Sequence, residues 1–418
     1  MTIPGTNSMK KPKVDEAIAE QFLAADLDEV AKLQEEGKKY NYKTVVVYRN
    51  VALFAALHIG SLIGLYQVVF QAKWQTVAWM VFLHIFGGLG ITAGAHRLWS
   101  HRSYKAKLPV RILLMIMNCS ALQNDIIEWV RDHRCHHKWT DTHADPHNTT
   151  RGFFFAHMGW LLVRKHPQIK EQGAKLDLSD LFADPVCTFQ RKYYLPLVLI
   201  FCFLIPTAIP VKYWGESAFV AFYTAGLLRY CLLLHATWLI NSAAHYFGFK
   251  PYDKHISPVE SVWTTVSAIG EGGHNFHHTF PQDYRTSEYS LKLNWTRIFI
   301  DTCAALGLVY DRKSFSEEII QRQCEKHGSP EDRGKAIMWG ALASLWNKSG
   351  VYDVRTTNIA EAFHRRLIVL LDYFPLLSDV IGMFHTLEAE CRARLNFLEM
   401  HPNRKRRSAV KPYSDEAR

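Results

Sequence analysis

The chain has 418 residues and a formal net charge of +10, from 49 Lys and Arg against 39 Asp and Glu. This length would accommodate two or three soluble domains, but the apolar residues concentrate in four separate windows, which indicates an integral membrane protein. The basic balance fits a cytosolic surface beside anionic lipid, or one that receives acidic partners. Nucleic acid is excluded as a partner, because no nucleic-acid-binding module is recognisable and the basic residues flank the apolar windows.

The four windows are near the length of a helix that crosses a bilayer core. A soluble protein could bury helices of this kind, but four in one chain make that alternative the weaker one. Short polar joints within each pair predict two helical hairpins. The apolar stretch 112–122 is too short to span, so it is expected to be a buried or interfacial helix. The predicted spans are about 51–70, 76–95, 195–211 and 218–240.

Basic residues set the orientation of these spans. Lys38, Lys39, Lys43 and Arg49 precede the first span, whereas Lys73 is nearly alone in the first hairpin loop. Both termini are therefore expected in the cytosol, together with the large polar segments 96–194 and 241–330. We divide the chain into a cytosolic segment 1–48, a membrane domain 49–330 and an extension 331–418 of unknown role, whose apolar stretch "LIVLLDYFPLLSDVIGMF" we expect to be interfacial.

Histidines cluster just outside the predicted spans. "RDHRCHHK" and "EGGHNFHH" share the spacing H-x-x-H-H. Since residues i, i+3 and i+4 share one helix face, each motif is expected to converge on a single point. "HRLWSH" places two histidines five residues apart, on two sides of a helix, which suits ligands that reach toward two different ions. The motif histidines are His133, His136 and His137, His274, His277 and His278, and His96 and His101.

Eight histidines exceed what one four- to six-coordinate ion can use, so two metal ions are predicted. Imidazole alone does not choose among iron, copper, zinc and nickel, but all-nitrogen sites with open positions suit oxygen chemistry. Glu128 and Glu271 lie near the motifs without the Glu-x-x-His spacing of soluble carboxylate-bridged di-iron proteins. Asp145 is available to orient a neighbouring imidazole. Five other histidines lack ligand spacing and are expected at the surface or in supporting roles: His143, His147, His157, His166 and His235.

The strings "HRLWSH", "HRCHHK", "NSAAH" and "EGGHNFHH", in this order and with spans between them, resemble the animal-type acyl-CoA delta-9 desaturases of the stearoyl-CoA desaturase family, over about residues 40 to 325. The resemblance implies an all-α integral membrane protein whose cytosolic helical cap holds a histidine-rich di-metal centre. It adds His245 as a ninth metal ligand and Asn241 as the residue that holds a metal-bound water.

By the same resemblance, the CoA head is held by Asn124, Arg131, Asp132, Arg164 and Lys165. A kink in the acyl tunnel is formed by Gln123, Trp129 and Thr237, and the tunnel ends near His84 and Gly88. Many family members carry an aromatic residue where His84 stands, so the preference between 16- and 18-carbon chains is left open.

The implied reaction inserts a cis double bond between carbons 9 and 10 of saturated acyl-CoA, using two irons and O2. The chain contains no His-Pro-Gly-Gly haem-binding stretch, so electrons would come from NADH through separate cytochrome b5 and its reductase, at the endoplasmic reticulum membrane. One alternative is a membrane lipid hydroxylase with similar histidine motifs, against which the full "EGGHNFHH" and "NSAAH" strings weigh. A remoter one is a non-catalytic metal-binding or transport protein, which would place ligands inside the spans.

Overall fold

The computed structural model describes residues 25, 27–40, 42–288 and 293–332. Most of the predicted extension, including its apolar stretch, lies outside these residues, as does most of segment 1–48. Nearly all regular structure in the described part is helical, with one short pair of strands, and this confirms the all-α fold class.

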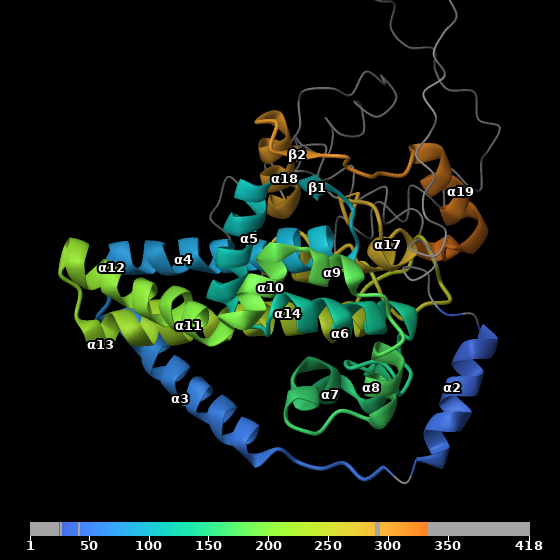
Figure 1. The fold of residues 1–418 in the computed structure, drawn as a ribbon, viewed down its shortest axis with the longest axis horizontal. Coiled ribbons are helices and arrows are strands. Elements are labelled where there is room, and N and C mark those ends of the chain that lie inside the picture. Colours follow the sequence, from blue (N-terminus) through green and yellow to red (C-terminus); the bar gives the residue numbers. More distant parts are fainter. Residues whose placement is uncertain (1–24, 26, 41, 289–292, 333–418) are drawn as a thin grey trace, which may run out of the picture. The chain divides into compact units, whose positions relative to one another are not determined.

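The elements follow one another along the chain in the order shown in Figure 1. The helices before the third span are α2 (Leu27–Lys39), α3 (Tyr48–Phe70), α4 (Trp74–Leu89), the π-helix η1 (Gly90–Ser100), α5 (Leu108–Ala121), α6 (Ile126–Lys138), η2 (Thr149–Arg151), α7 (Phe153–His157), η3 (Gly159–Leu161), α8 (Pro167–Gly173), α9 (Ser179–Ala183) and α10 (Pro185–Lys192). The later helices are α11 (Tyr194–Val198), η4 (Leu199–Leu204), α12 (Ile205–Trp214), α13 (Ala218–Ala221), η5 (Phe222–Leu228), α14 (Arg229–Asn241), α15 (Ala243–Tyr246), α16 (Val262–Ser267), α17 (His274–Thr279), α18 (Trp295–Ala305) and α19 (Glu317–His327). Strands β1 (Lys105–Ala106) and β2 (Val309–Tyr310) pair antiparallel.

Four helices in the described residues are long and apolar enough to cross a membrane: Tyr48–Phe70, Trp74–Ser100, Tyr194–Trp214 and Ala218–Tyr246. They confirm the four predicted spans, and the chain is a multi-pass membrane protein. Helices serve here because each satisfies its own backbone hydrogen bonds where no water is available. The two hairpins are joined at their loops, where the Lys73 ammonium donates to the carbonyls of Trp214 and Gly215, both at 2.7 Å.

The second span ends in a π-helical segment, η1. Gly90, its first residue, lies against α5 so closely that a Cβ atom would meet the backbone of Met117 and Asn118 at 2.2–2.3 Å. Only glycine allows this approach. The wide turn continues to the end of the segment, where the His101 N–H donates to the carbonyl of His96, five residues back, at 3.1 Å.

Helices α5 and α6 are separated by a bend of 82°. The predicted short apolar helix is α5, with 14 residues. Leu122 and Asn124 in the bend have positive φ values of 48° and 72°, and Asp125 then caps α6 by accepting from the N–H of Glu128. A positive φ is unfavourable for leucine, so packing of the surrounding helices must hold this bend in place.

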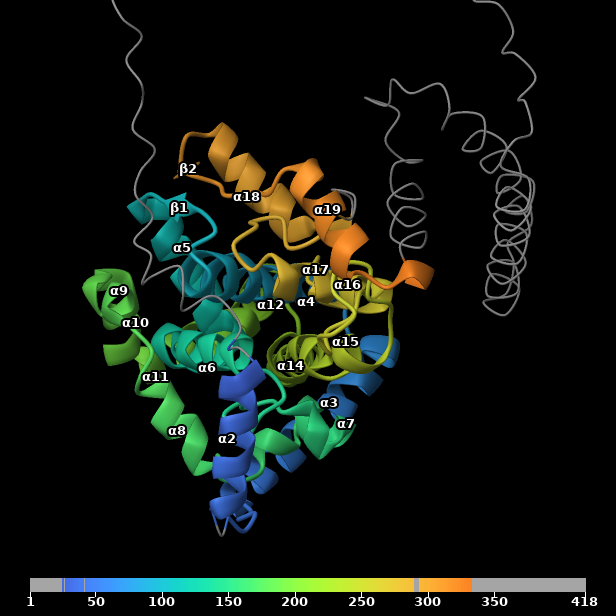
Figure 2. The same ribbon diagram turned by 90° about the vertical axis from the view of Figure 1, so that its right-hand side faces the viewer.

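Two buried arginines join segments outside the spans to η1, at the end of the second span. Arg134 on α6 donates to Asp180 at 2.8 Å and to the carbonyl of Trp99 on η1 at 2.9 Å. Arg97 on η1 donates to Glu271 at 2.7 Å. Figures 1 and 2 both place α18 and α19 on one side of α6 and α14, and α7 and α8 on the other. The ends of the second and fourth spans, α6 and α17 therefore meet in a fixed arrangement.

Candidate metal centre

The structure brings all nine sequence-predicted histidines together, in two adjacent groups. Within each group the candidate ligand atoms all lie within 4.8 Å of one another. The rings of His137 and His278, one from each group, stack at 4.0 Å between centroids. The five-histidine group consists of His96, His101, His133, His137 and His277, and the four-histidine group consists of His136, His245, His274 and His278.

Each H-x-x-H-H motif is divided between the two groups, so the prediction that it converges on one point is wrong. On α6, His133 and His137 belong to the five-histidine group and His136 to the other. On α17 the pattern is reversed: His277 is the one α17 histidine in the five-histidine group, and His274 and His278 belong to the other group. Helices α6 and α17 face each other across the groups, so the i and i+4 side chains of one helix meet the i+3 side chain of the other.

The prediction that His96 and His101 reach toward different ions is also wrong, because both belong to the five-histidine group. The reason is the π-helical turn of η1. In an α-helix, residues five apart diverge, but a turn closed by an i to i+5 hydrogen bond returns the fifth residue to the same side. Their rings lie 4.9 Å apart between centroids.

The spacing of nitrogen atoms fits a cation in the five-histidine group. The Nε2 atom of His277 lies 2.8 Å from Nε2 of His96 and 3.0 Å from Nε2 of His137. A ring nitrogen carries either one proton or one lone pair in its plane, so it cannot make a good hydrogen bond to both neighbours. One metal ion, about 2.1 Å from each nitrogen, accommodates lone pairs at this separation. The donor set therefore fits a metal better than it fits a hydrogen-bonded cluster.

Oxygen atoms on the opposite edges of the rings hold the imidazoles in position. Nδ1 of His96 lies 2.9 Å from a carboxylate oxygen of Glu271, and Nδ1 of His136 lies 3.0 Å from Asp145. A carboxylate only accepts, so each Nδ1 carries the proton and each Nε2 presents its lone pair to the centre. The expected orienting role of Asp145 is thus seen at His136. Nε2 of His136 and of His278 is buried and has no hydrogen-bond partner among the described residues.

The electrostatics at the histidines of α17 favour neutral imidazole, the form that binds metals. Burial, followed by neighbouring imidazoles, holds the pKa of His274, His277 and His278 well below the ordinary value. Burial opposes the charged form of Glu271, but Arg97 and His96 beside it keep the pKa of this carboxyl below its usual value. Glu271 therefore stays ionised and accepts from both neighbours.

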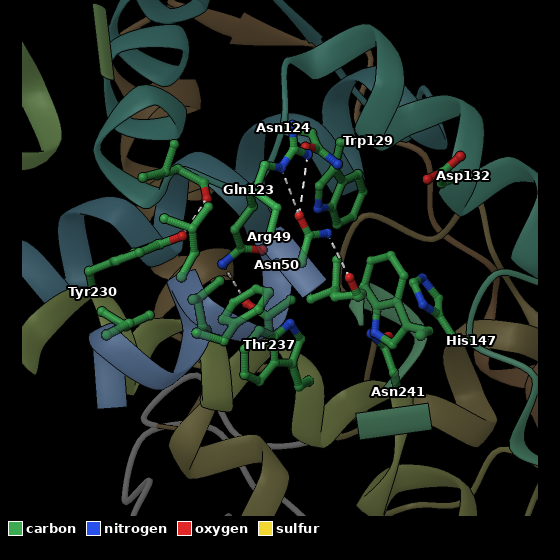
Figure 3. Close-up of a pocket in the computed structure, with 18 of the residues that line it drawn as sticks. Arg49, Asn50, Gln123, Asn124, Trp129, Asp132, His147, Tyr230, Thr237 and Asn241 are labelled. Atoms are coloured by element: carbon green, nitrogen blue, oxygen red, sulfur yellow. Dashed lines mark hydrogen bonds between the residues drawn. The ribbon is translucent and has the colours of Figure 1, made fainter. Parts of the chain in front are cut away.

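A cavity of about 610 Å³ opens beside the five-histidine group, with His133 in its wall. Figure 3 shows Gln123, Trp129, Thr237 and Asn241 around it. The Gln123 amide donates to the Thr237 hydroxyl at 2.9 Å, and the Trp129 ring stacks on His133 at 4.9 Å. The sequence-predicted residues that line the cavity are Gln123, Asn124, Trp129, Asp132, Thr237 and Asn241.

Other sequence-predicted substrate residues do not line this cavity. Arg131 and Lys165 lie next to it, because both pair with Asp132, Arg131 at 2.8 Å. The Arg164 side chain is exposed, and its backbone N–H donates to Val45. Gly88 packs beside Ile269, and His84 lies on the same helix, α4, away from the cavity lining. A role for His84 and Gly88 at a tunnel end stays a prediction.

Two of the five histidines left out of the ligand set, which were expected at the surface or in supporting roles, are buried. His147 and His166 are only 8% and 5% exposed. The His147 ring lies 5.5 Å from that of His136 and lines the cavity. Its sequence neighbourhood, "ADPH", forms the turn that also carries Asp145, and that turn was the signal that could have placed it. His235 belongs to a separate cluster described below.

Comparison with known proteins agrees with this site. The family model described as fatty acid desaturase matches residues 43–313. The chain is 70% identical over 333 residues to the Delta(9)-fatty-acid desaturase fat-6 of Caenorhabditis elegans, covering 80% of this chain and 98% of the relative. It is 54% identical over 286 residues to the stearoyl-CoA desaturase of Homo sapiens, covering 68% of this chain and 79% of the relative. The chain belongs to the fatty acid desaturase family.

Proposed function

We propose that this protein is an acyl-CoA delta-9 desaturase, which inserts a cis double bond between carbons 9 and 10 of saturated 16- and 18-carbon acyl-CoA. The observation that carries the proposal is that His133 belongs both to the five-histidine group and to the wall of the cavity. The names of the most similar relatives supply the substrate class and the bond position.

We assign one iron to each histidine group, with His245 as a ligand in the four-histidine group. Bound iron would supply the oxidising chemistry by which O2, two electrons and two protons remove two hydrogens from the chain and leave as two waters. The protein's part is to hold the ligand lone pairs in place, through Glu271 at His96 and Asp145 at His136. Asn241 lines the same cavity, and we assign it the role of holding a water at the metal.

The cavity wall positions the acyl chain. Leu57, Leu227 and Leu234 make the wall largely apolar and exclude bulk water from the reacting carbons. The Gln123 to Thr237 hydrogen bond crosses the wall close to Trp129, which stacks on His133, so a bend in the bound chain at this point would bring two methylenes to the centre.

Charged residues beside the cavity suit the CoA head. Arg131 and Lys165 carry positive charge next to Asp132 at the cavity wall, and Arg164 precedes Lys165 in the chain. Guanidinium and ammonium groups bind phosphate well, and we assign them to the CoA phosphates, with Asn124 nearby. The head fixed here would set the distance to the reacting carbons, and His84 and Gly88 on α4 would limit the far end of the chain.

We further propose that electrons come from NADH through cytochrome b5 and its reductase, and that the protein lies in the endoplasmic reticulum membrane with both termini in the cytosol. The basic residues that flank the spans support this orientation. We place the donor on separate proteins because these 418 residues contain no His-Pro-Gly-Gly haem-binding stretch.

Reconstitution of the purified chain tests the proposal. Iron-loaded protein in detergent is mixed with stearoyl-CoA, O2, NADH, cytochrome b5 and its reductase, and the products are analysed by mass spectrometry. We expect 9-cis oleoyl-CoA, with no product when cytochrome b5 is omitted. A hydroxylated acyl chain would contradict the proposed reaction, and product formation without cytochrome b5 would contradict the proposed donor.

A further inference from the structure

A second cluster of metal-binding residue types lies between the first and fourth spans, apart from the nine histidines. His58 lies on α3, and Cys231 and His235 lie one turn apart on α14. The candidate ligand atoms of these three residues lie within 4.8 Å of one another. Two histidines are costly within membrane-spanning helices, so their convergence beside a cysteine calls for a function.

A hydrogen bond to a carbonyl fixes where the proton of His58 lies. Nδ1 of His58 is 2.6 Å from the carbonyl of Phe54, which only accepts, so this Nδ1 carries the proton of the neutral ring. Its Nε2 therefore presents a lone pair. That Nε2 lies 3.1 Å from Nε2 of His235.

The protons of His235 depend on the Ser242 hydroxyl, which lies 2.9 Å from both the carbonyl of Trp238 and Nδ1 of His157. When the hydroxyl donates to the carbonyl, it accepts from Nδ1 of His157, and Nε2 of neutral His157 accepts from Nδ1 of His235 at 3.0 Å. Neutral His235 is then left with a lone pair on Nε2, directed at the lone pair of His58. When the hydroxyl donates to Nδ1 of His157 instead, the chain reverses and Nε2 of His235 donates to His58.

In the first arrangement two lone pairs face each other at 3.1 Å, and one cation between them satisfies both. The thiol of Cys231, which is 5% exposed, completes a set of two nitrogens and one sulfur around this point. Thiolate and imidazole together select soft ions such as Cu(I) and Zn(II). We propose that His58, Cys231 and His235 bind one such thiophilic metal ion, at a site separate from the nine-histidine centre.

The site would clamp the first span to the fourth behind the cavity. Leu57, next to His58, and Leu234 and Trp238 on α14 form one hydrophobic cluster with Cys231, and all three also line the cavity. An ion that cross-links α3 and α14 here would fix that wall. Its role is structural, since none of the three ligands lines the cavity.

Sulfur ligation distinguishes this site from the nine-histidine centre, where every proposed ligand is nitrogen. The full chain is purified in detergent, loaded with Zn(II) or, under reducing conditions, with Cu(I), and studied by X-ray absorption and by metal-to-protein ratio. The variants are Cys231→Ser and His235→Asn. The matched control is Cys303→Ser, which removes another buried cysteine, 7% exposed and outside the cluster.

We expect a metal–sulfur shell at about 2.3 Å in the wild type and in Cys303→Ser. Cys231→Ser should lose this shell, and both Cys231→Ser and His235→Asn should bind one ion fewer per chain than the wild type. Because the ratio is read as a difference, the result does not depend on how many ions the nine-histidine centre holds. Wild-type protein without a metal–sulfur shell after loading with either ion would overturn the proposal, and would indicate that a proton lies between the two rings. A shell retained in Cys231→Ser would overturn it as well.

Discussion

Asp145 offers a sharp test of how the ligands are held, because it orients a proposed ligand without touching the cavity or the metal. It is 2% exposed, and its Oδ1 atom accepts from Nδ1 of His136 at 3.0 Å and from the N–H of His147 at 2.8 Å. Oδ2 accepts from the N–H of Asp141 at 2.9 Å. In Asp145→Ala both carboxylate oxygens are removed. The His136 ring and the N–H groups of Asp141 and His147 all lose their acceptor.

Loss of an oriented ligand partner costs about 10- to 100-fold in metal affinity or activity. This corresponds to about 1.4–2.8 kcal/mol. We expect Asp145→Ala to reduce desaturation of stearoyl-CoA by this factor and to lower the iron content at limiting iron, with KM for acyl-CoA unchanged. The assay is product formation by the purified, reconstituted enzyme, with iron measured in the same samples. Activity within twofold of wild type at limiting iron would refute the reasoning that Asp145 fixes the His136 ring.

Three further predictions concern the centre and its scaffold. His274→Ala should reduce desaturase activity by more than about 100-fold, beyond the loss expected for residues that only orient ligands. His143→Ala, which lies outside both histidine groups, should keep wild-type activity. Equal activity of the two variants would remove His274 from the ligand set. Gly90→Ala should destabilise the fold by about 3 kcal/mol, because its Cβ would meet the α5 backbone at 2.2 Å. Gly226→Ala is the control, since its Cβ makes no contact closer than 3.6 Å. Thermal unfolding in detergent compares the two variants, and matching curves would contradict the proposed close approach. Removal of the metal by a chelator should lower the stability of the fold, by about 4 kcal/mol if the free metal had been present at 1,000 times its Kd. Addition of Fe(II) should restore the stability. A chelated protein as stable as the loaded one would argue against a metal centre.

The sequence was sufficient to predict the four spans and to single out eight of the nine histidines that the structure brings together. Long apolar runs leave few alternatives to membrane helices, and the H-x-x-H-H spacing indicates metal binding without knowledge of the fold. His245 was different, because it stands alone after the fourth span and only the resemblance to known desaturases singled it out. Its neighbours in space, such as His274, are distant in sequence.

The division of ligands between the two groups could not be predicted, because it depends on how α6 and α17 face each other. Nor could the π-helical turn that brings His96 and His101 together, since "GITAGAHRLWS" carries no signal that distinguishes it from an α-helix. The bend between α5 and α6 could not be predicted either. Leu122 and Asn124 both have a positive φ there, but neither is a glycine, the residue that would signal such a conformation. In each case tertiary packing decides the local conformation.

The most direct test of the proposed function is lipid analysis of a desaturase-deficient host that expresses this chain, with the double bond located by mass spectrometry. We expect new 16- and 18-carbon monounsaturated chains with the cis bond between carbons 9 and 10, absent in cells that express His274→Ala at the same level. Double bonds at another position, hydroxylated chains, or an unchanged lipid profile with well-expressed, iron-loaded protein would contradict the assignment as a delta-9 desaturase.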